Sequence, residues 1–240
     1  EAFVVEMRAV STRIKELDSG SPFRISAFNR RPDGTLYYLK MLASENVSKL
    51  YVRTGLDGHE KLLVNPELRN ASTAEHHTLQ FYAPSSNGKY ILYGISKAGN
   101  EETTLFILDV TTGRDLPDSI DRLESWYCTP EWLPGDRSFV YSRLQPTTSE
   151  TPRTELYNNS RTYRHRLGDD PEKDRLLLSA GLFQQVSIAV TDFPSVWISP
   201  ESDYCIAKIT HGDQNEISLY SAQLKSLSKS DVGWTRICDV

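Results

Sequence analysis

The chain has 240 residues, of which 38% are hydrophobic and 25% are charged, the composition of a globular protein long enough to bury a substantial core. Its 27 basic and 32 acidic residues give a net charge of −5, which offers no field to attract nucleic acid or an anionic membrane. No apolar run approaches the roughly 20 residues needed to cross a bilayer. We therefore expect neither a nucleic-acid partner nor a membrane partner.

The first 21 residues predict an amphipathic helix followed by a linker. Apolar residues recur at intervals of three or four along residues 1–17, which is the spacing of one helix face. Gly20 and Pro22 then end the helical pattern. Such a helix must lie on another surface, and nothing in it reads as a strand that could close a ring of sheets.

After the linker, the sequence predicts short antiparallel strands separated by turns. The clearest unit is residues 83–117, with a turn at 84–88, an apolar strand at 90–94, a polar turn at 97–101 and a second strand at 104–108. The strands are rich in β-branched and aromatic residues, and clusters of Gly, Asn and Ser bound them. This alternation indicates an all-β fold.

The unit is repeated. An aromatic residue of the later strand stands at Tyr51, Phe106, Tyr163 and Tyr220, a period of roughly 55 to 57 residues. Each repeat has four short strands whose apolar faces need a neighbour to be buried, as in the blades of a β-propeller. The four predicted blades are approximately residues 22–68, 75–121, 126–180 and 186–240. Four blades could form a small closed propeller or part of a larger one.

The third repeat carries an insertion. Residues 146–159 are polar and rich in Thr, Ser and Pro, which predicts a long mobile loop.

The cysteines argue for a reducing compartment. Cys128, Cys205 and Cys238 are odd in number and far apart, so they do not form a disulfide framework and are interpreted as small core residues. We expect a cytoplasmic protein.

No segment predicts a metal or cofactor site. His76 and His77 are neighbours on a strand and point to opposite faces, and His211 near Asp213 is an equally weak candidate. Residues 169–174 are acidic but lack the central Gly and terminal Glu of a calcium loop, which favours a solvated hairpin turn. We expect no metal and no cofactor.

Four segments, in their order and spacing, resemble the N-terminal part of the prolyl oligopeptidase family of serine peptidases. They are residues 50–58 (LYVRTGLDG), 87–99 (NGKYILYGISKAG), 110–118 (VTTGRDLPD) and 163–168 (YRHRLG). In that family a helical segment leads into a seven-bladed propeller, which caps an α/β-hydrolase domain and limits access to short peptides. The resemblance implies that this chain holds the helix and about the first four of seven blades.

The catalytic domain of that family is not in this sequence. A serine nucleophile of this class sits in a Gly-x-Ser-x-Gly elbow, and no such pentapeptide occurs here. No alternation of strands and helices could form the parallel hydrolase sheet. The chain alone is expected to be inactive, with no catalytic residue of its own. Its implied partners are the C-terminal hydrolase domain of a full-length protein and short peptide substrates.

The resemblance nominates four residues for substrate gating or the domain interface. Glu101 matches an acidic family position facing the hydrolase domain, with a solvated turn carboxylate as the alternative. Trp126 and Tyr127 lie near a family aromatic of the substrate pocket, with a core role as the alternative. Thr210 stands where prolyl oligopeptidases have a peptide-binding Arg, and a Thr cannot supply a guanidinium's bidentate hydrogen bonds.

The substitution at Thr210 leaves the parent specificity open. Cleavage after proline is the leading hypothesis, and an oligopeptidase B-like parent that cleaves after basic residues is an alternative. A free-standing propeller that serves as a protein-binding scaffold is the other, because propellers host many functions. If blades are missing, the isolated fragment should expose strand edges and self-associate.

Overall fold

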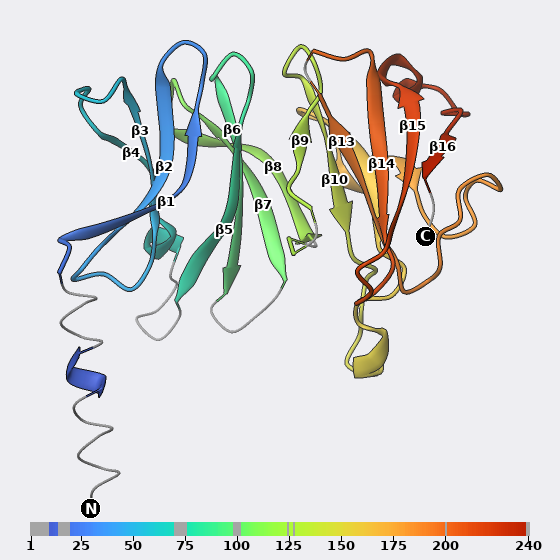
Figure 1. Ribbon diagram of the computed structural model, residues 1–240, viewed down its shortest axis with the longest axis horizontal. Coiled ribbons are helices and arrows are strands. Elements are labelled where there is room, and N and C mark those ends of the chain that lie inside the picture. The colour runs from blue at the N-terminus through green and yellow to red at the C-terminus, as the bar shows by residue number, and fades with distance from the viewer. Residues whose placement is uncertain are drawn as a thin grey trace, which may run out of the picture. The chain divides into compact units, whose positions relative to one another are not determined.

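The computed structural model describes residues 10–13, 20–69, 76–97, 102–123, 125–126, 128–199 and 201–238 (Figure 1). Residues 10–13 are helical, and the rest of the predicted N-terminal helix lies outside these ranges. The strands of the described residues are β1 (Phe23–Arg30), β2 (Thr35–Leu42), β3 (Lys49–Thr54), β4 (Lys61–Val64), β5 (His77–Pro84), β6 (Tyr90–Lys97), β7 (Thr103–Asp109), β8 (Arg114–Leu123), β9 (Glu131–Trp132), β10 (Ser138–Arg143), β11 (Arg161–Arg166), β12 (Arg175–Leu178), β13 (Phe193–Ile198), β14 (Tyr204–Thr210), β15 (Ile217–Gln223) and β16 (Thr235–Cys238). Four 3-10 helices accompany them: η1 (Pro66–Arg69), η2 (Arg153–Glu155), η3 (Pro171–Lys173) and η4 (Leu224–Ser228).

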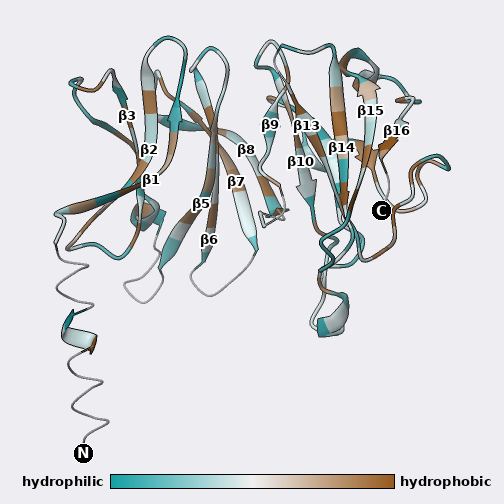
Figure 2. Ribbon diagram, viewed as in Figure 1, coloured by the Kyte–Doolittle hydropathy of each residue, from teal (hydrophilic) through white to brown (hydrophobic). Residues whose placement is uncertain are grey.

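All described strand pairs are antiparallel neighbours in sequence, apart from one link between sheets. The orders are β1-β2-β3-β4, then β5 to β8, then β9 to β12, then β13-β14-β15-β16. We call these four groups the first to fourth sheets, although the second and third are linked through the single pair Leu123 and Arg143, at the ends of β8 and β10. This confirms the predicted all-β repeat of four-stranded units. Hydrophobic residues concentrate on the strands, and hydrophilic residues on the turns between them (Figure 2).

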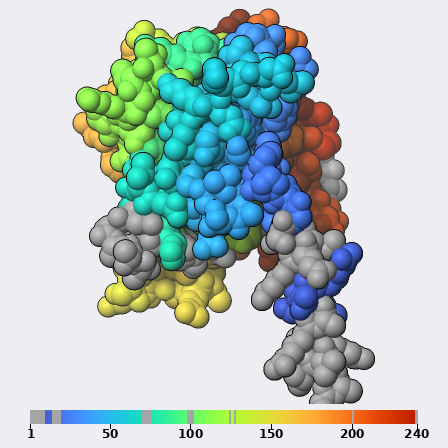
Figure 3. Space-filling model, turned by 90° about the vertical axis from the view of Figure 1, so that its left-hand side faces the viewer, coloured from blue at the N-terminus to red at the C-terminus, as the bar shows by residue number. Residues whose placement is uncertain are grey.

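The chain divides into two compact units, residues 1–79 and residues 80–240. The first unit contains the first sheet, whose core is formed by β2 and β3, with Leu36, Tyr38 and Leu50 almost fully buried. Its edge strand β1 is exposed along its whole length. Figure 3 views the chain from the side of this sheet, whose residues run from blue to cyan.

Tight turns join the strands of the second unit. Gly88 and Gly135 adopt φ of 71° and 90° in the β5–β6 and β9–β10 turns, a conformation that favours glycine. Asp136 also has a positive φ, of 55°. Its carboxylate accepts hydrogen bonds from the backbone N–H groups of Ser86 and Asn87, both at 2.8 Å. These bonds offset the backbone strain and tie the turn of the second sheet to that of the third.

Two apolar cores lie in the second unit, one on each side of the third sheet. Phe139 and Tyr141 of β10 pack with residues of β5 to β8. Val140 of β10, together with Leu177 and Leu178 of β12, packs with residues of β13 to β15. Because successive side chains of a strand point to opposite faces, one strand supplies both cores.

The predicted insertion has some local structure. Residues 146–159 contain η2, and Gln145 donates to the carbonyl of Glu155 at 2.6 Å. The backbone N–H of Asn159 donates to the carbonyl of Val190 at 2.6 Å. The mobility of this loop stays a prediction. Among the described residues, no helix has both the length and the apolar character that a membrane span requires.

Candidate functional site

The structure describes two of the four nominated residues, because Glu101 and Tyr127 lie outside the described ranges. Trp126 stands in the segment between β8 and β9 with 70% of its surface exposed, so the core interpretation of this side chain is wrong. Thr210 is the last residue of β14 and only 6% exposed. Its hydroxyl is buried and has no hydrogen-bond partner among the residues that the structure describes.

A chain of three polar side chains surrounds the end of β14. His211 Nδ1 lies 3.0 Å from Asp192 Oδ2, and His211 Nε2 lies 2.8 Å from Ser218 Oγ. The strand register explains the meeting, since Thr210 pairs with Phe193 on one side and Ile217 on the other. Asp192 Oδ2 also accepts from the backbone N–H of Ala189 at 2.8 Å.

This Asp192–His211–Ser218 relay has the order of a catalytic triad, but its serine is not accessible to a substrate. Ser218, the second residue of β15, is only 1% exposed, so a substrate carbonyl carbon cannot approach its hydroxyl. The relay instead fixes the turn between β14 and β15, where Gly212 takes a φ of 55°. The relay therefore holds the backbone of this turn in place next to Thr210.

A second polar cluster is buried between the second and third sheets. His165 of β11 is fully buried, with Nδ1 2.9 Å from both carboxylate oxygens of Asp174 and Nε2 3.4 Å from Asp118 Oδ2. Tyr141 donates its hydroxyl to Asp174 Oδ2 at 2.7 Å, and the Gly168 N–H donates to Asp118 Oδ2 at 2.7 Å. Every polar group of the cluster therefore has a partner.

The cluster sets the protonation of its members. Burial lowers the pKa of His165, but the hydrogen bonds and charges of Asp174 and then Asp118 outweigh it, and the net pKa lies above the ordinary 6.5. Burial, together with the neighbouring Asp174 carboxylate, raises the pKa of Tyr141 far above its usual range, so the phenol remains a donor. The arrangement is an imidazole held between two carboxylates, which favour its protonated form.

The acidic segment 169–174 is only partly the solvated turn that the sequence predicts. Asp170 is exposed and caps η3 by accepting from the Glu172 N–H. The side chain of Asp174 is only 3% exposed because it faces His165 and Tyr141. The core interpretation of the cysteines is also wrong in part, since Cys205 is buried but Cys238 is exposed.

The sequence model of the prolyl oligopeptidase N-terminal β-propeller domain matches residues 8–196. The chain belongs to the prolyl oligopeptidase family. Prolyl endopeptidase of Elizabethkingia miricola is 23% identical over 194 residues, which cover 79% of this chain and 25% of that protein. Prolyl oligopeptidase A of Galerina marginata is 31% identical over 126 residues, which cover 46% of this chain and 16% of that protein. The chain thus spans a quarter or less of the length of these relatives.

Solved structures of the family show the same fold. A prolyl endopeptidase, from work on inter-domain dynamics in catalysis and specificity, superimposes with a TM-score of 0.77 at 24% identity, over 97% of this chain and 32% of that one. Prolyl oligopeptidase B of Galerina marginata, bound to a 35-residue hydrolysis and macrocyclization substrate, gives a TM-score of 0.72 at 17% identity, over 93% of this chain and 32% of that one. The four-stranded units are thus propeller blades of this family.

Sequence reasoning missed both polar clusters in this propeller. His211 drew notice only as a metal candidate, and His165 only as part of a family-like segment. Their partners stand 19 and 47 residues away in the chain, at Asp192 and Asp118. Only the strand register and the packing of neighbouring blades bring them together.

Proposed function

We propose that this chain is the propeller portion of a serine peptidase that hydrolyses oligopeptides, most simply after proline. Its role is to restrict access to an α/β-hydrolase active site carried by another part of the full-length protein. The observation that carries the proposal is the family match over residues 8–196 on a chain that lacks the Gly-x-Ser-x-Gly elbow. The hydrolase domain then carries out peptide-bond hydrolysis, and this chain limits the size of the substrates that reach it.

The turn between β14 and β15 is the part of the propeller that we assign to the peptide. Thr210 stands at its start with a buried, unpartnered hydroxyl, and the Asp192–His211–Ser218 relay holds its backbone. A hydroxyl offers one neutral donor where a guanidinium would offer a charged fork, so this position contributes less to peptide affinity than an Arg would.

The test uses the full-length protein that carries this chain. A fluorophosphonate probe reports an active serine, and fluorogenic peptides with proline or arginine before the scissile bond report the specificity. We expect labelling and post-proline cleavage. Cleavage after arginine would contradict the specificity for proline and support an oligopeptidase B-like parent. A purified full-length protein that the probe does not label would contradict the peptidase function.

Size restriction needs its own measurement. The same cleavage sequence is presented in a short flexible peptide and in a surface loop of a folded protein. We expect kcat/KM to fall steeply for the folded carrier, because it cannot pass the propeller. Equal kcat/KM values for the two would contradict the restricting role and leave the peptidase activity standing.

The chain expressed by itself should self-associate. Strand β1 exposes Phe23, Ile25 and Phe28 at 40%, 43% and 55%, and Ile237 of β16 is 54% exposed. Apolar side chains on an outer strand invite pairing with another copy. We expect concentration-dependent sedimentation and dye binding, both reduced by Phe28→Lys. A dye-silent monomer at all concentrations would contradict this.

We also propose a reducing, cytoplasmic location. Among the described residues, Cys205 and Cys238 are free cysteines, and oxidising compartments favour disulfides. Alkylation of intact cells followed by mass spectrometry should find the exposed Cys238 as a free thiol. A disulfide or mixed disulfide at this residue would contradict the location.

A further inference from the structure

The face of the third sheet that points to the fourth carries two arginines side by side. Arg164 of β11 and Arg175 of β12 are directly paired across the two strands. Arg164 donates to the Ser228 hydroxyl at 2.6 Å and to the Ser138 hydroxyl at 3.3 Å, and Arg175 donates to the carbonyl of Lys229. Both guanidinium groups therefore reach the η4 turn of the next blade and are half-buried there.

All of these acceptors are neutral. Neither Arg164 nor Arg175 forms an ion pair within the part of the chain that the structure describes, and the Nε of Arg175 is buried with no hydrogen-bond partner. Arg143 of the same blade differs, because it is buried and both Asp121 and Glu172 pair with it. Like charges directly opposite each other on neighbouring strands destabilise a sheet unless something neutralises them.

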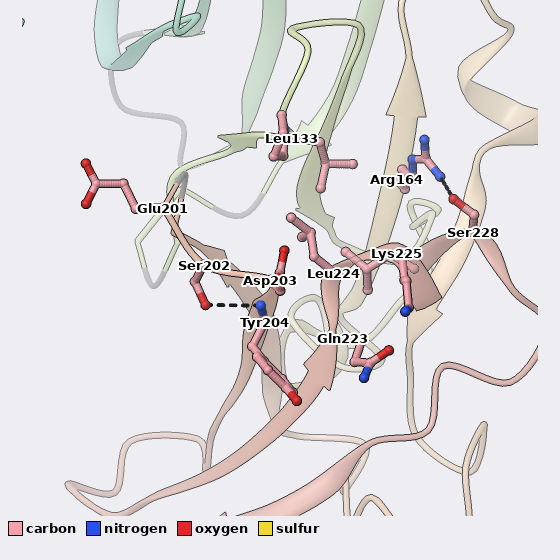
Figure 4. A pocket seen from close by; sticks show the side chains of 12 residues that line it. Leu133, Arg164, Glu201, Ser202, Asp203, Tyr204, Gln223, Leu224, Lys225 and Ser228 are labelled. Atoms are coloured by element: carbon pink, nitrogen blue, oxygen red, sulfur yellow. Dashed lines mark hydrogen bonds between the residues drawn. The ribbon is translucent and has the colours of Figure 1, made fainter.

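A cavity of about 750 Å³ opens beside Arg164, while Arg175, its cross-strand neighbour, lies outside the lining of this cavity. Arg164 lines it, Lys225 of η4 lies on the same side, and Leu133, Leu224 and Leu227 supply apolar walls (Figure 4). Burial and the neighbouring charges of Arg175 and Arg166 lower the pKa of Arg164, which is the sign of positive charge without compensation. The size is that of a small-molecule site.

We propose that Arg164 and Arg175, with Lys225 at the rim, form a binding site for a doubly charged tetrahedral oxyanion of the phosphate class. Two adjacent guanidinium groups match a charge of −2 and present planar pairs of N–H donors to its oxygens. Glu201 and Asp203 line the other side of the cavity, which disfavours an extended polyanion such as nucleic acid. The bound ion bridges β11 and β12 of the third blade to η4 of the fourth.

Isothermal titration of the full-length protein tests the site with inorganic phosphate, phosphoserine and acetate, each at an ionic strength held constant with sodium chloride. We expect saturable binding of one phosphate or one phosphoserine per chain, and far weaker binding of acetate. Tighter phosphate binding would identify a free ion as the ligand, and tighter phosphoserine binding would identify a phosphate ester. No binding beyond the chloride control would overturn the proposal.

Matched variants locate the site. Arg164→Gln and Arg175→Gln should each weaken phosphate binding by at least about tenfold, since each removes charge-assisted donors. Arg161→Gln makes the same charge change in the same strand, three residues from Arg164, where the side chain points to the opposite face, and it should leave the affinity unchanged. If either arginine variant fails to fold, Lys225→Gln on the exposed turn should still weaken binding several-fold. Equal affinities for Arg161→Gln and Arg175→Gln would overturn the assignment.

Discussion

The two faces of the third blade are built on different chemistry, although the same strands supply both. In β11, His165 points to the second blade, while Thr162 and Arg164 point to the fourth. The first face combines an aromatic core with an imidazole between two carboxylates. The second face combines a mostly aliphatic core, which also contains Tyr220 and Trp234, with hydroxyl groups that donate to a backbone carbonyl. Adjacent blade interfaces in one propeller thus differ in how strongly pH can act on them.

The difference follows from the two-residue period of a strand. A single blade must satisfy two neighbours, and alternate residues can be selected independently for each. The face toward the second blade depends on ion pairs that need one protonation state, so its stability is conditional. The face toward the fourth blade depends mainly on buried apolar area, which no change of pH removes. One titratable contact there is Glu131, whose carboxylate accepts from the backbone N–H of Ile198 and whose pKa is raised by burial. Perturbing one residue on each face separates these two sources of stability.

The largest effect is expected for Asp174→Ala. The Asp174 carboxylate is the partner of both the His165 imidazole and the Tyr141 hydroxyl, and its removal leaves two buried polar groups without that partner. Breaking a buried pair from one side costs about 3–5 kcal/mol of unfolding free energy. Urea denaturation measures the loss. Asp213→Ala, in the exposed turn between β14 and β15, is the control and should not move the urea midpoint. Equal losses of unfolding free energy for the two variants would contradict a stabilising role of the buried cluster.

On the opposite face, Ile209→Ala should cost about 2–5 kcal/mol of unfolding free energy, because it empties space in a core where Ile209 is 0% exposed. The loss should be the same at acidic and alkaline pH, since no titrating group is involved. Parallel urea titrations at the two pH values check this. A loss that changes with pH would contradict the separation of the two faces.

The wild-type protein should lose stability as pH rises, through His165. The folded-state pKa of this group lies above its ordinary value of 6.5, so its contribution is complete below pH 6.5 and disappears as pH increases through the folded pKa. The groups that face it are Asp118, Asp174 and the neutral Tyr141. Subtracting the urea midpoints of His165→Asn from those of the wild type isolates this term. A difference that stays constant or grows toward alkaline pH would contradict the imidazolium.

Much of this fold could be predicted from the sequence, because its strands are short, apolar and bounded by turn residues. The second sheet illustrates this, with strands predicted at 90–94 and 104–108 and found as Tyr90–Lys97 and Thr103–Asp109. The local sequence pattern predicts a strand less clearly where a proline interrupts that strand. Pro117 lies inside β8, where the register shifts between Phe106 and Leu108 of β7, and a residue without an N–H is tolerated at such an irregularity.

The polar sites could not be predicted in the same way. A turn residue such as Asp174 has a charged neighbourhood in sequence, which suggests solvent, and its burial depends on His165 and Tyr141 reaching it across two strands. The interpretation of Thr210 came from a family position rather than from its surroundings. Its unpartnered hydroxyl and the neighbouring relay become visible only when Phe193 and Ile217 are placed beside it.

The smallest effect is expected for the hydroxyl groups between the third and fourth blades. Ser142 and Thr162 both donate to the Pro194 carbonyl at 2.8 Å, so either one alone still satisfies it. Ser142→Ala should therefore cost no more than about 1 kcal/mol of unfolding free energy, and Thr162→Val a similar amount. The double variant leaves the buried carbonyl without both donors and should cost more than the sum of the two single changes. Additive losses in a double-mutant cycle would mean that the two hydroxyl groups act independently and would contradict their shared role at the Pro194 carbonyl.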